Sequence, residues 1–162
     1  MPFRSRSIVA SVLLLASVGQ ACACGLAWSP NPADALLSAK LTNRLAIVVF
    51  TGSDWSRSTA QLDQEVLMNV EFTDFATRHF ALANADFPQR NLPAKELLAE
   101  NTEFASRHKI TKWPTLLAIR PDGSEFGRIE YGGENAFDLL KRLEEWQARY
   151  QTESSSVRIF VE

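Results

Sequence analysis

The residues LAIVVFTGSDWSRST, Leu45 to Thr59, decide the fold predicted for this chain. Six consecutive apolar residues, Leu45 to Phe50, predict a strand that is covered on both faces, as is typical of a parallel sheet. A turn containing Gly52 follows, and the next residues begin a helix. At such a junction the free N–H groups of the helix lie at the carboxyl edge of the sheet, where α/β proteins place their sites. We therefore expect the functional site near Ser56.

Apolar periodicity outside this stretch predicts the remaining elements of one α/β domain. Further strands are expected at residues 80–85, 115–119 and 126–131. The turn Pro121-Asp122-Gly123 should join the last two strands into a hairpin. Helices are expected at residues 33–41, from 58 onward, and at 71–79, 94–108 and 137–150. From the first buried strand the predicted order is β, α, β, α, β, β, α, which gives a mixed central sheet with helices on both faces.

Several short motifs of the chain resemble one known family. The motifs VVFTGSDW, LDQEV, NVEF, ANADFPQ and KWPT together are similar to the thioredoxin superfamily, specifically to its secreted bacterial thioredoxin-like members. The resemblance spans roughly residues 45–146 and implies the α/β thioredoxin-like fold. In that family of thiol:disulfide oxidoreductases, Cys-x-x-Cys follows the tryptophan of GSDW. This chain has Ser56-Arg57-Ser58-Thr59 at those positions.

The N-terminal residues predict a signal peptide rather than a part of the fold. Arg4 and Arg6 precede an apolar run, and the small residues Ala21 and Ala23 follow it, which is the pattern of an export leader over residues 1–23. We expect export to the periplasm or cell envelope. The alternative is a lipoprotein that is lipidated at Cys22 or Cys24, and only in that case do we expect membrane attachment.

The remaining chain divides into three predicted parts. Residues 24–44 are expected to form a linker and a helix, residues 45–150 the thioredoxin-like domain, and residues 151–162 a C-terminal tail. The polar stretch 151–156 is expected to be loose, and residues 157–161 to form a short strand or no regular structure. We expect a monomer.

Composition excludes several classes of site. The formal net charge of −2 becomes −4 if a leader with Arg4 and Arg6 is removed, so we expect no binding to nucleic acid. The sequence has two cysteines, both in or next to the predicted leader, and two histidines, which are too few ligands for a tetrahedral zinc site. We expect no metal and no cofactor. His79 and His108 lie near predicted helix ends and are interpreted as structural residues.

The four residues after Trp55 exclude ordinary thiol chemistry. Disulfide exchange needs a thiolate to attack and a second thiol to resolve the mixed disulfide. Ser56 and Thr59 supply neither, and Phe50 stands where thioredoxins have an aspartate six residues before the first cysteine. We expect no catalytic residue and no enzyme activity. Ser58 followed by Gln61 is a capping-box pattern, which favours a helix-capping role for the serines.

The second motif, KWPT, suggests what the site could still do. The resemblance implies that Pro114 is cis, that the residue before it pairs through its backbone with an extended substrate, and that the tryptophan of GSDW walls the groove. We predict a groove for an extended peptide or a partner protein, formed by Trp55, Ser56, Arg57, Trp113, Pro114 and Thr115. The tryptophans could instead pack inward as core. The alternative function is a thiol:disulfide oxidoreductase that relies on Cys24 or on a partner's thiols.

Overall fold

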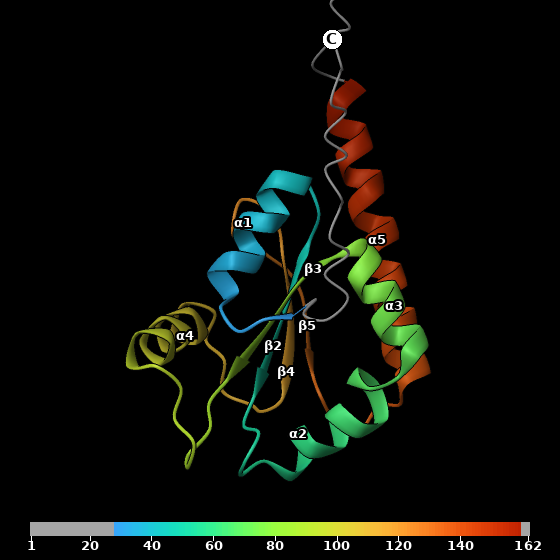
Figure 1. The fold of residues 1–162 in the computed structure, drawn as a ribbon. Coiled ribbons are helices and arrows are strands. Elements are labelled where there is room, and N and C mark those ends of the chain that lie inside the picture. Colours follow the sequence, from blue (N-terminus) through green and yellow to red (C-terminus); the bar gives the residue numbers. More distant parts are fainter. Residues whose placement is uncertain (1–27, 160–162) are drawn as a thin grey trace, which may run out of the picture.

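The fold was obtained as a computed structural model, which describes residues 28–159, with side chains to residue 156. The predicted leader, Cys22 and Cys24 lie outside the described residues. In chain order the elements are β1 (Trp28–Ser29), α1 (Pro32–Thr42), β2 (Ala46–Thr51), α2 (Arg57–Leu62), the π-helix η1 (Asp63–Leu67), α3 (Val70–His79), β3 (Ala81–Asp86), α4 (Lys95–Arg107), β4 (Thr115–Ile119), β5 (Glu125–Glu130) and α5 (Ala136–Ile159). Figure 1 shows their arrangement.

The five strands form one mixed sheet in the order β1-β3-β2-β4-β5. Strands β1, β3 and β2 run parallel, whereas β4 is antiparallel to β2 and β5 is antiparallel to β4. All six residues of β2 are buried, as expected for a central strand with helices on both sides. The predicted α/β thioredoxin-like fold is confirmed.

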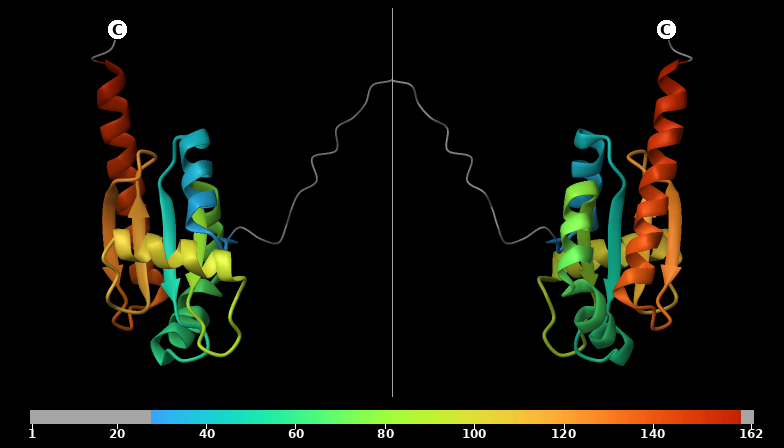
Figure 2. Two further views of the ribbon diagram at one scale, coloured as in Figure 1. Left: turned by 90° about the vertical axis from the view of Figure 1, so that its left-hand side faces the viewer. Right: turned by 90° about the vertical axis from the view of Figure 1, so that its right-hand side faces the viewer.

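Helices cover both faces of the sheet, and β2 contributes to both sides (Figures 1 and 2). Because side chains alternate along a strand, Val48 and Phe50 pack with α1 and α4, whereas Ile47 and Val49 pack with α2, α3 and α5. The core between the sheet and helices α2, α3 and α5 also includes Phe72 of α3. An apolar run that lacks alternation thus supplies two separate cores.

The short strand β1 was not expected. Residues 24–44 were expected to form only a linker and a helix, but Trp28 and Ser29 pair in parallel with Leu82 and Ala83 of β3. Two residues are too few to show a strand period in sequence, so only the pairing partner reveals this element.

The C-terminal helix is longer than expected. The prediction of a loose segment at 151–156 was wrong, and residues 157–159 are helical rather than a strand or irregular. Helix α5 continues to Ile159 and projects past the sheet in Figure 2. The hydroxyls of Thr152, Ser155 and Ser156 each donate to the carbonyl one turn earlier, at 2.8–3.0 Å, so these polar side chains are satisfied within the helix. Within the described part of the chain, no helix combines the length and the apolar character needed to cross a bilayer.

Candidate functional site

The candidate site begins in the turn between β2 and α2. The N–H groups of Trp55 and Ser56 both donate to the carbonyl of Gly52, at 3.3 and 2.8 Å, which closes the turn. The N-cap of α2 is Ser56, whose Oγ accepts the N–H of Thr59 at 3.2 Å. Serine capping was expected, but at Ser58, which instead lies exposed within the first turn. The sequence pattern therefore placed the cap two residues too late.

The two positions at which the family resemblance predicts cysteines carry hydroxyl groups with structural partners. Thr59 is completely buried, and its Oγ1 accepts the N–H of Gly52 at 3.2 Å. Ser56 is half-buried and caps the helix, while Arg57 between them is exposed. Each hydroxyl thus satisfies a backbone N–H group that would otherwise lack a partner.

Three aromatic side chains meet beside this turn. The rings of Trp55 and Trp113 lie 6.3 Å apart in an edge-to-face arrangement, and Phe87 lies 4.6 Å from Trp113. Trp113 is half-buried and also contacts Phe50 of the core, whereas Trp55 keeps 43% of its surface exposed. We refer to Trp55, Phe87 and Trp113 as the aromatic surface. Trp55 is exposed, as expected for a residue that walls a groove. One part of the Trp113 ring packs against the core, and the rest is exposed.

The KWPT segment contributes to the aromatic surface mainly through Trp113. The Trp113–Pro114 peptide bond is cis. Pro114 and Thr115 are buried, and the Thr115 hydroxyl donates to the carbonyl of Lys112 at 2.9 Å. The carbonyl of Pro114 accepts the N–H of Tyr131, but the main chain of Trp113 has no hydrogen-bond partner among residues 28–159. Of the two residues after Trp113, neither exposes a side chain for a ligand.

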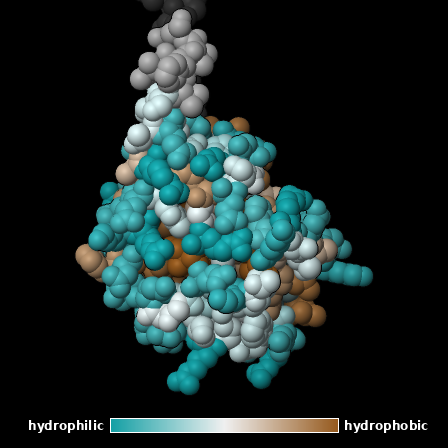
Figure 3. Space-filling view, turned by 180° about the vertical axis from the view of Figure 1, so that it is seen from behind, coloured by the Kyte–Doolittle hydropathy of each residue, from teal (hydrophilic) through white to brown (hydrophobic). Residues whose placement is uncertain are grey.

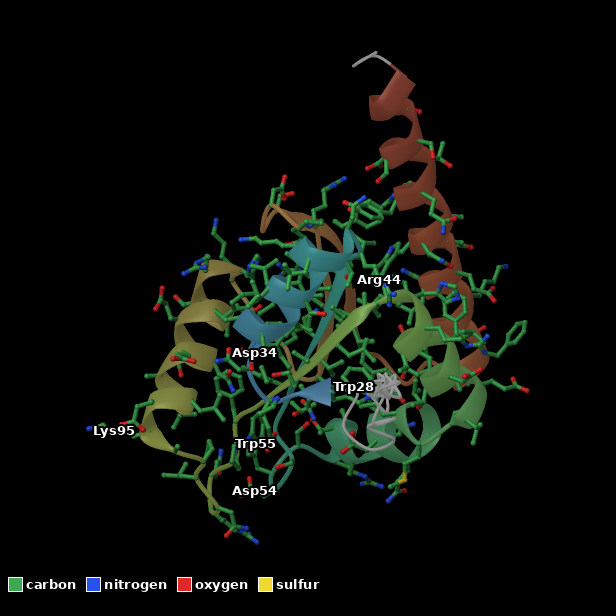
Figure 4. The ribbon with its side chains drawn as sticks, turned by 45° about the horizontal axis from the view of Figure 1, so that its top comes forward. Trp28, Asp34, Arg44, Asp54, Trp55 and Lys95 are labelled. Atoms are coloured by element: carbon green, nitrogen blue, oxygen red, sulfur yellow. The ribbon has the colours of Figure 1, made fainter. Side chains whose placement is uncertain are left out.

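The loop after β3 is fastened to the same turn, which the sequence reasoning missed. Trp55 Nε1–H donates to the carbonyl of Phe87 at 2.7 Å. The Asp54 carboxylate accepts the N–H groups of Gln89 and Arg90 at 2.8 and 2.6 Å, and these hydrogen bonds hold its pKa below the ordinary value. Figure 4 shows Asp54 and Trp55 together at this end of the domain. No sequence pattern indicates that Asp54 and Trp55 hold the loop after β3, because the loop lies more than 30 residues further along the chain.

Two further carboxyl groups lie behind the turn. Asp86, at the end of β3, accepts hydrogen bonds from Thr51 at 2.9 Å and from the N–H and hydroxyl of Ser53 at 2.9 and 2.5 Å. Asp63, in η1, is partly buried, and burial together with the negative charge of Asp86 raises its pKa. The hydrogen bonds to Asp86 hold the turn in place, so Asp86 has a structural role.

The histidines are held by aromatic neighbours. His79 lies 4.4 Å from the ring of Phe75 and is hydrogen-bonded to Gln147 of α5. His108 lies 4.8 Å from the ring of Phe104, and burial lowers its pKa. Both environments agree with a structural interpretation.

Comparisons with known proteins identify the family of the chain. The model of the thioredoxin-like domain family matches residues 32–147. The disulfide bond reductase DsbH of Chlamydia pneumoniae is 32% identical over 117 residues, which cover 71% of this chain and 70% of that protein. The thioredoxin-related protein DsbJ of the same organism is 24% identical over 115 residues, but the chain spans only 33% of its length.

Solved structures agree on the fold. A structure described as DsbH oxidoreductase superposes with a TM-score of 0.71 at 25% identity, covering 89% of this chain and 95% of the other. A thioredoxin from Thermus thermophilus gives a TM-score of 0.57 at 22% identity, covering 73% and 84% of the two chains, and supports the fold alone.

Proposed function

The chain belongs to the thioredoxin-like family, and we propose that within it this protein binds an extended peptide or a partner protein without exchanging thiols. The observation that carries the proposal is the pair of hydroxyls at Ser56 and Thr59, engaged in backbone hydrogen bonds beside the aromatic surface. The aromatic surface is partly exposed and supports a role in recognition, whereas Ser56 and Thr59 carry no sulfur for exchange.

The chemistry at the helix start supports this proposal. A serine hydroxyl is not ionised at neutral pH and forms no stable sulfur–sulfur intermediate, so Ser56 cannot replace an attacking thiolate. A serine nucleophile of another kind needs a base within hydrogen-bond reach. Both histidines are held elsewhere, and the Ser56 hydroxyl is occupied as a helix cap.

The aromatic surface supports recognition of an extended chain. Partly exposed tryptophans supply a large contact area at a small cost in conformational entropy and are enriched where proteins bind each other. The main chain of Trp113 has no partner among the described residues, so it is available to pair with the backbone of an added strand. We place the contact at Trp55, Ser56, Arg57 and the backbone around Trp113, with Pro114 and Thr115 supporting it from below.

The proposal includes the cellular setting. The leader pattern at residues 1–23 favours an exported protein of the periplasm or cell envelope, with a lipid anchor if Cys22 or Cys24 is modified. We further propose that it acts as a monomer. Its partners would therefore be other proteins of that compartment.

The experiment that tests the proposal places a photo-crosslinking residue at position 113 of the protein in its native envelope. We expect discrete covalent adducts with one or a few proteins, which mass spectrometry can identify. Phe137 provides the matched control, because it is an aromatic residue that is 73% exposed on α5. Adducts that form equally from positions 113 and 137 would contradict a specific contact at the aromatic surface.

The name of the relative DsbH, a disulfide bond reductase, favours a second candidate function. In this alternative the protein is a thiol:disulfide oxidoreductase that uses Cys24 or a partner's thiols. Insulin reduction by the purified protein, lost on Cys24→Ser, would establish the alternative and refute the binding proposal. The mass of the mature N-terminus would show independently whether a free Cys24 thiol is present.

A further inference from the structure

A cavity of about 400 Å³ lies at the end of the domain where β2 begins. Its walls come from the turn between α1 and β2, the last turn of α3, and the part of α5 that extends past the sheet. Arg44 precedes β2 and Trp55 follows it, so the length of the central strand separates this cavity from the aromatic surface. Figure 4 shows the two residues toward opposite ends of the domain.

Hydrogen bonds between distant parts of the chain fix the walls of this cavity. The hydroxyl of Tyr150 donates to Asn43 Oδ1 at 3.1 Å and ties α5 to the turn before β2. Arg44 Nη1 donates to the carbonyl of Arg78 at 3.0 Å, at the end of α3. These two hydrogen bonds join the three elements that form the walls of the cavity.

The charged side chains that line the cavity are those of arginines. Arg44 and Arg78 both line it, and none of the described residues that line it is Asp or Glu. Arg78 is paired with Asp74 of its own helix, but Arg44 takes part in no ion pair within residues 28–156. The guanidinium of Arg44 carries five N–H donors, of which the bond to Arg78 uses one.

The wall formed by α5 adds uncharged hydrogen-bonding groups. The side chains of Gln151 and Ser154 line the cavity and have no partner among the described residues, whereas Ser155 bonds within its own helix. The ring of Tyr150 contributes apolar area beside them. A cavity of this volume is in the range that holds small organic ligands. Figure 3, from behind, shows a mostly hydrophilic face with only small apolar areas.

We propose that this cavity binds a small organic anion, with a phosphate or carboxylate group on Arg44 and an apolar body against Tyr150. A planar guanidinium binds either oxyanion through two parallel hydrogen bonds. The site lies apart from the aromatic surface, so the proposal does not depend on how that surface is used.

The test titrates three probes into the isotope-labelled protein and follows backbone amide resonances by NMR. The probes are phenyl phosphate, benzoate and benzyl alcohol, which share an aromatic body and differ in charge. We expect saturable shifts at residues 43–45, 78–80 and 150–155 with at least one of the two anions, and none with benzyl alcohol. The anion that binds more tightly identifies the preferred group.

Variants separate this site from general attraction of anions. Arg44→Gln should weaken anion binding at least about tenfold, because it removes the charge-assisted hydrogen bonds. Arg142→Gln removes the same charge from an exposed position elsewhere on α5 and should leave the affinity unchanged. If Arg44→Gln alters the fold, as its spectrum without a probe would show, Ser154→Ala replaces it, with a smaller expected loss. Absence of saturable shifts, equal binding of benzyl alcohol, or equal loss in Arg142→Gln would overturn the proposal.

Discussion

Restoring a dithiol at the helix start tests whether the site keeps the geometry of its family. The double variant Ser56→Cys/Thr59→Cys places two thiols three residues apart at the beginning of α2. The chain already presents the helix N-terminus, the adjacent Trp55 and the segment with Pro114. We therefore expect the two thiols to form an intramolecular disulfide and to give measurable insulin reduction.

The structure also predicts what this change does to stability. Loss of the Ser56 cap should cost about 1 kcal/mol. Loss of the Thr59 hydroxyl leaves the buried N–H of Gly52 without its acceptor, which should cost about 1–3 kcal/mol. The reduced variant should therefore be less stable than the parent by about 2–4 kcal/mol. Closing a four-residue loop restores about 2 kcal/mol in the oxidised form, because it restricts the unfolded chain.

Three measurements check this prediction. Mass spectrometry after oxidation should show the loss of two hydrogen atoms, urea unfolding should rank the reduced and oxidised forms, and insulin turbidity should report exchange. Arg57→Cys/Ala60→Cys is the matched control, because it has the same spacing one residue further along the helix and on exposed positions. A folded Ser56→Cys/Thr59→Cys variant without a disulfide would refute the described helix start. A reduced form as stable as the parent would refute the structural role of the hydroxyls.

Two further predictions concern the surroundings of the site. A Cβ at Gly52 would lie 2.3 Å from the ring of Trp55, so Gly52→Ala should turn this exposed indole outward, shift its N–H resonance and cost about 1–2 kcal/mol. Gly132→Ala, where the nearest atom is 3.8 Å away, should do neither, and equal effects would contradict the packing. Because Asp63 has a raised pKa, the folded state binds more protons than the unfolded state from about pH 4 up through the raised pKa, and stability falls with rising pH across that window. Asp63→Asn should therefore be more stable than the parent at pH 7 in urea unfolding, by less than about 1 kcal/mol because the group is partly exposed, and a less stable variant would contradict this sign.

Long apolar patterns made most of the fold predictable from sequence. A strand with one solvent-exposed face alternates apolar and polar residues, whereas the run from Leu45 to Phe50 is apolar throughout. Accordingly, β2 is buried along its whole length. The turn at Pro121-Asp122-Gly123 joins β4 to β5 as expected, with Gly123 at a positive φ of 89°. In these stretches the conformation that the residues favour locally is the one that the folded domain requires, so the sequence pattern alone predicted the structure.

Features that depend on distant partners could not be predicted in this way. The segment 151–156 has a loop-like composition, but Arg120, from the turn after β4, forms an ion pair with Glu153 of α5 at 3.1 Å. The contribution of Phe87 to the site follows from its carbonyl accepting the Trp55 indole, a contact across 32 residues. The cavity beside Arg44 likewise depends on the continuation of α5, because residues 151–155 of that helix form one of its walls. A prediction that ends the helix at residue 150 therefore misses the cavity.

The error in the helix cap is the most informative one, because it concerns the site itself. Ser58 and Gln61 fit the capping-box pattern, but the Gly52 carbonyl accepts the N–H of Ser56, and this bond fixes where the helix begins. Once the start is at Ser56, the cap and the buried acceptor fall on Ser56 and Thr59, the two positions where the family resemblance in the sequence predicts cysteines. A hydroxyl at each position meets the hydrogen-bonding needs of the backbone without the chemistry of a thiol. With these hydroxyls the helix start forms without sulfur at either position, and the aromatic surface lies directly beside it.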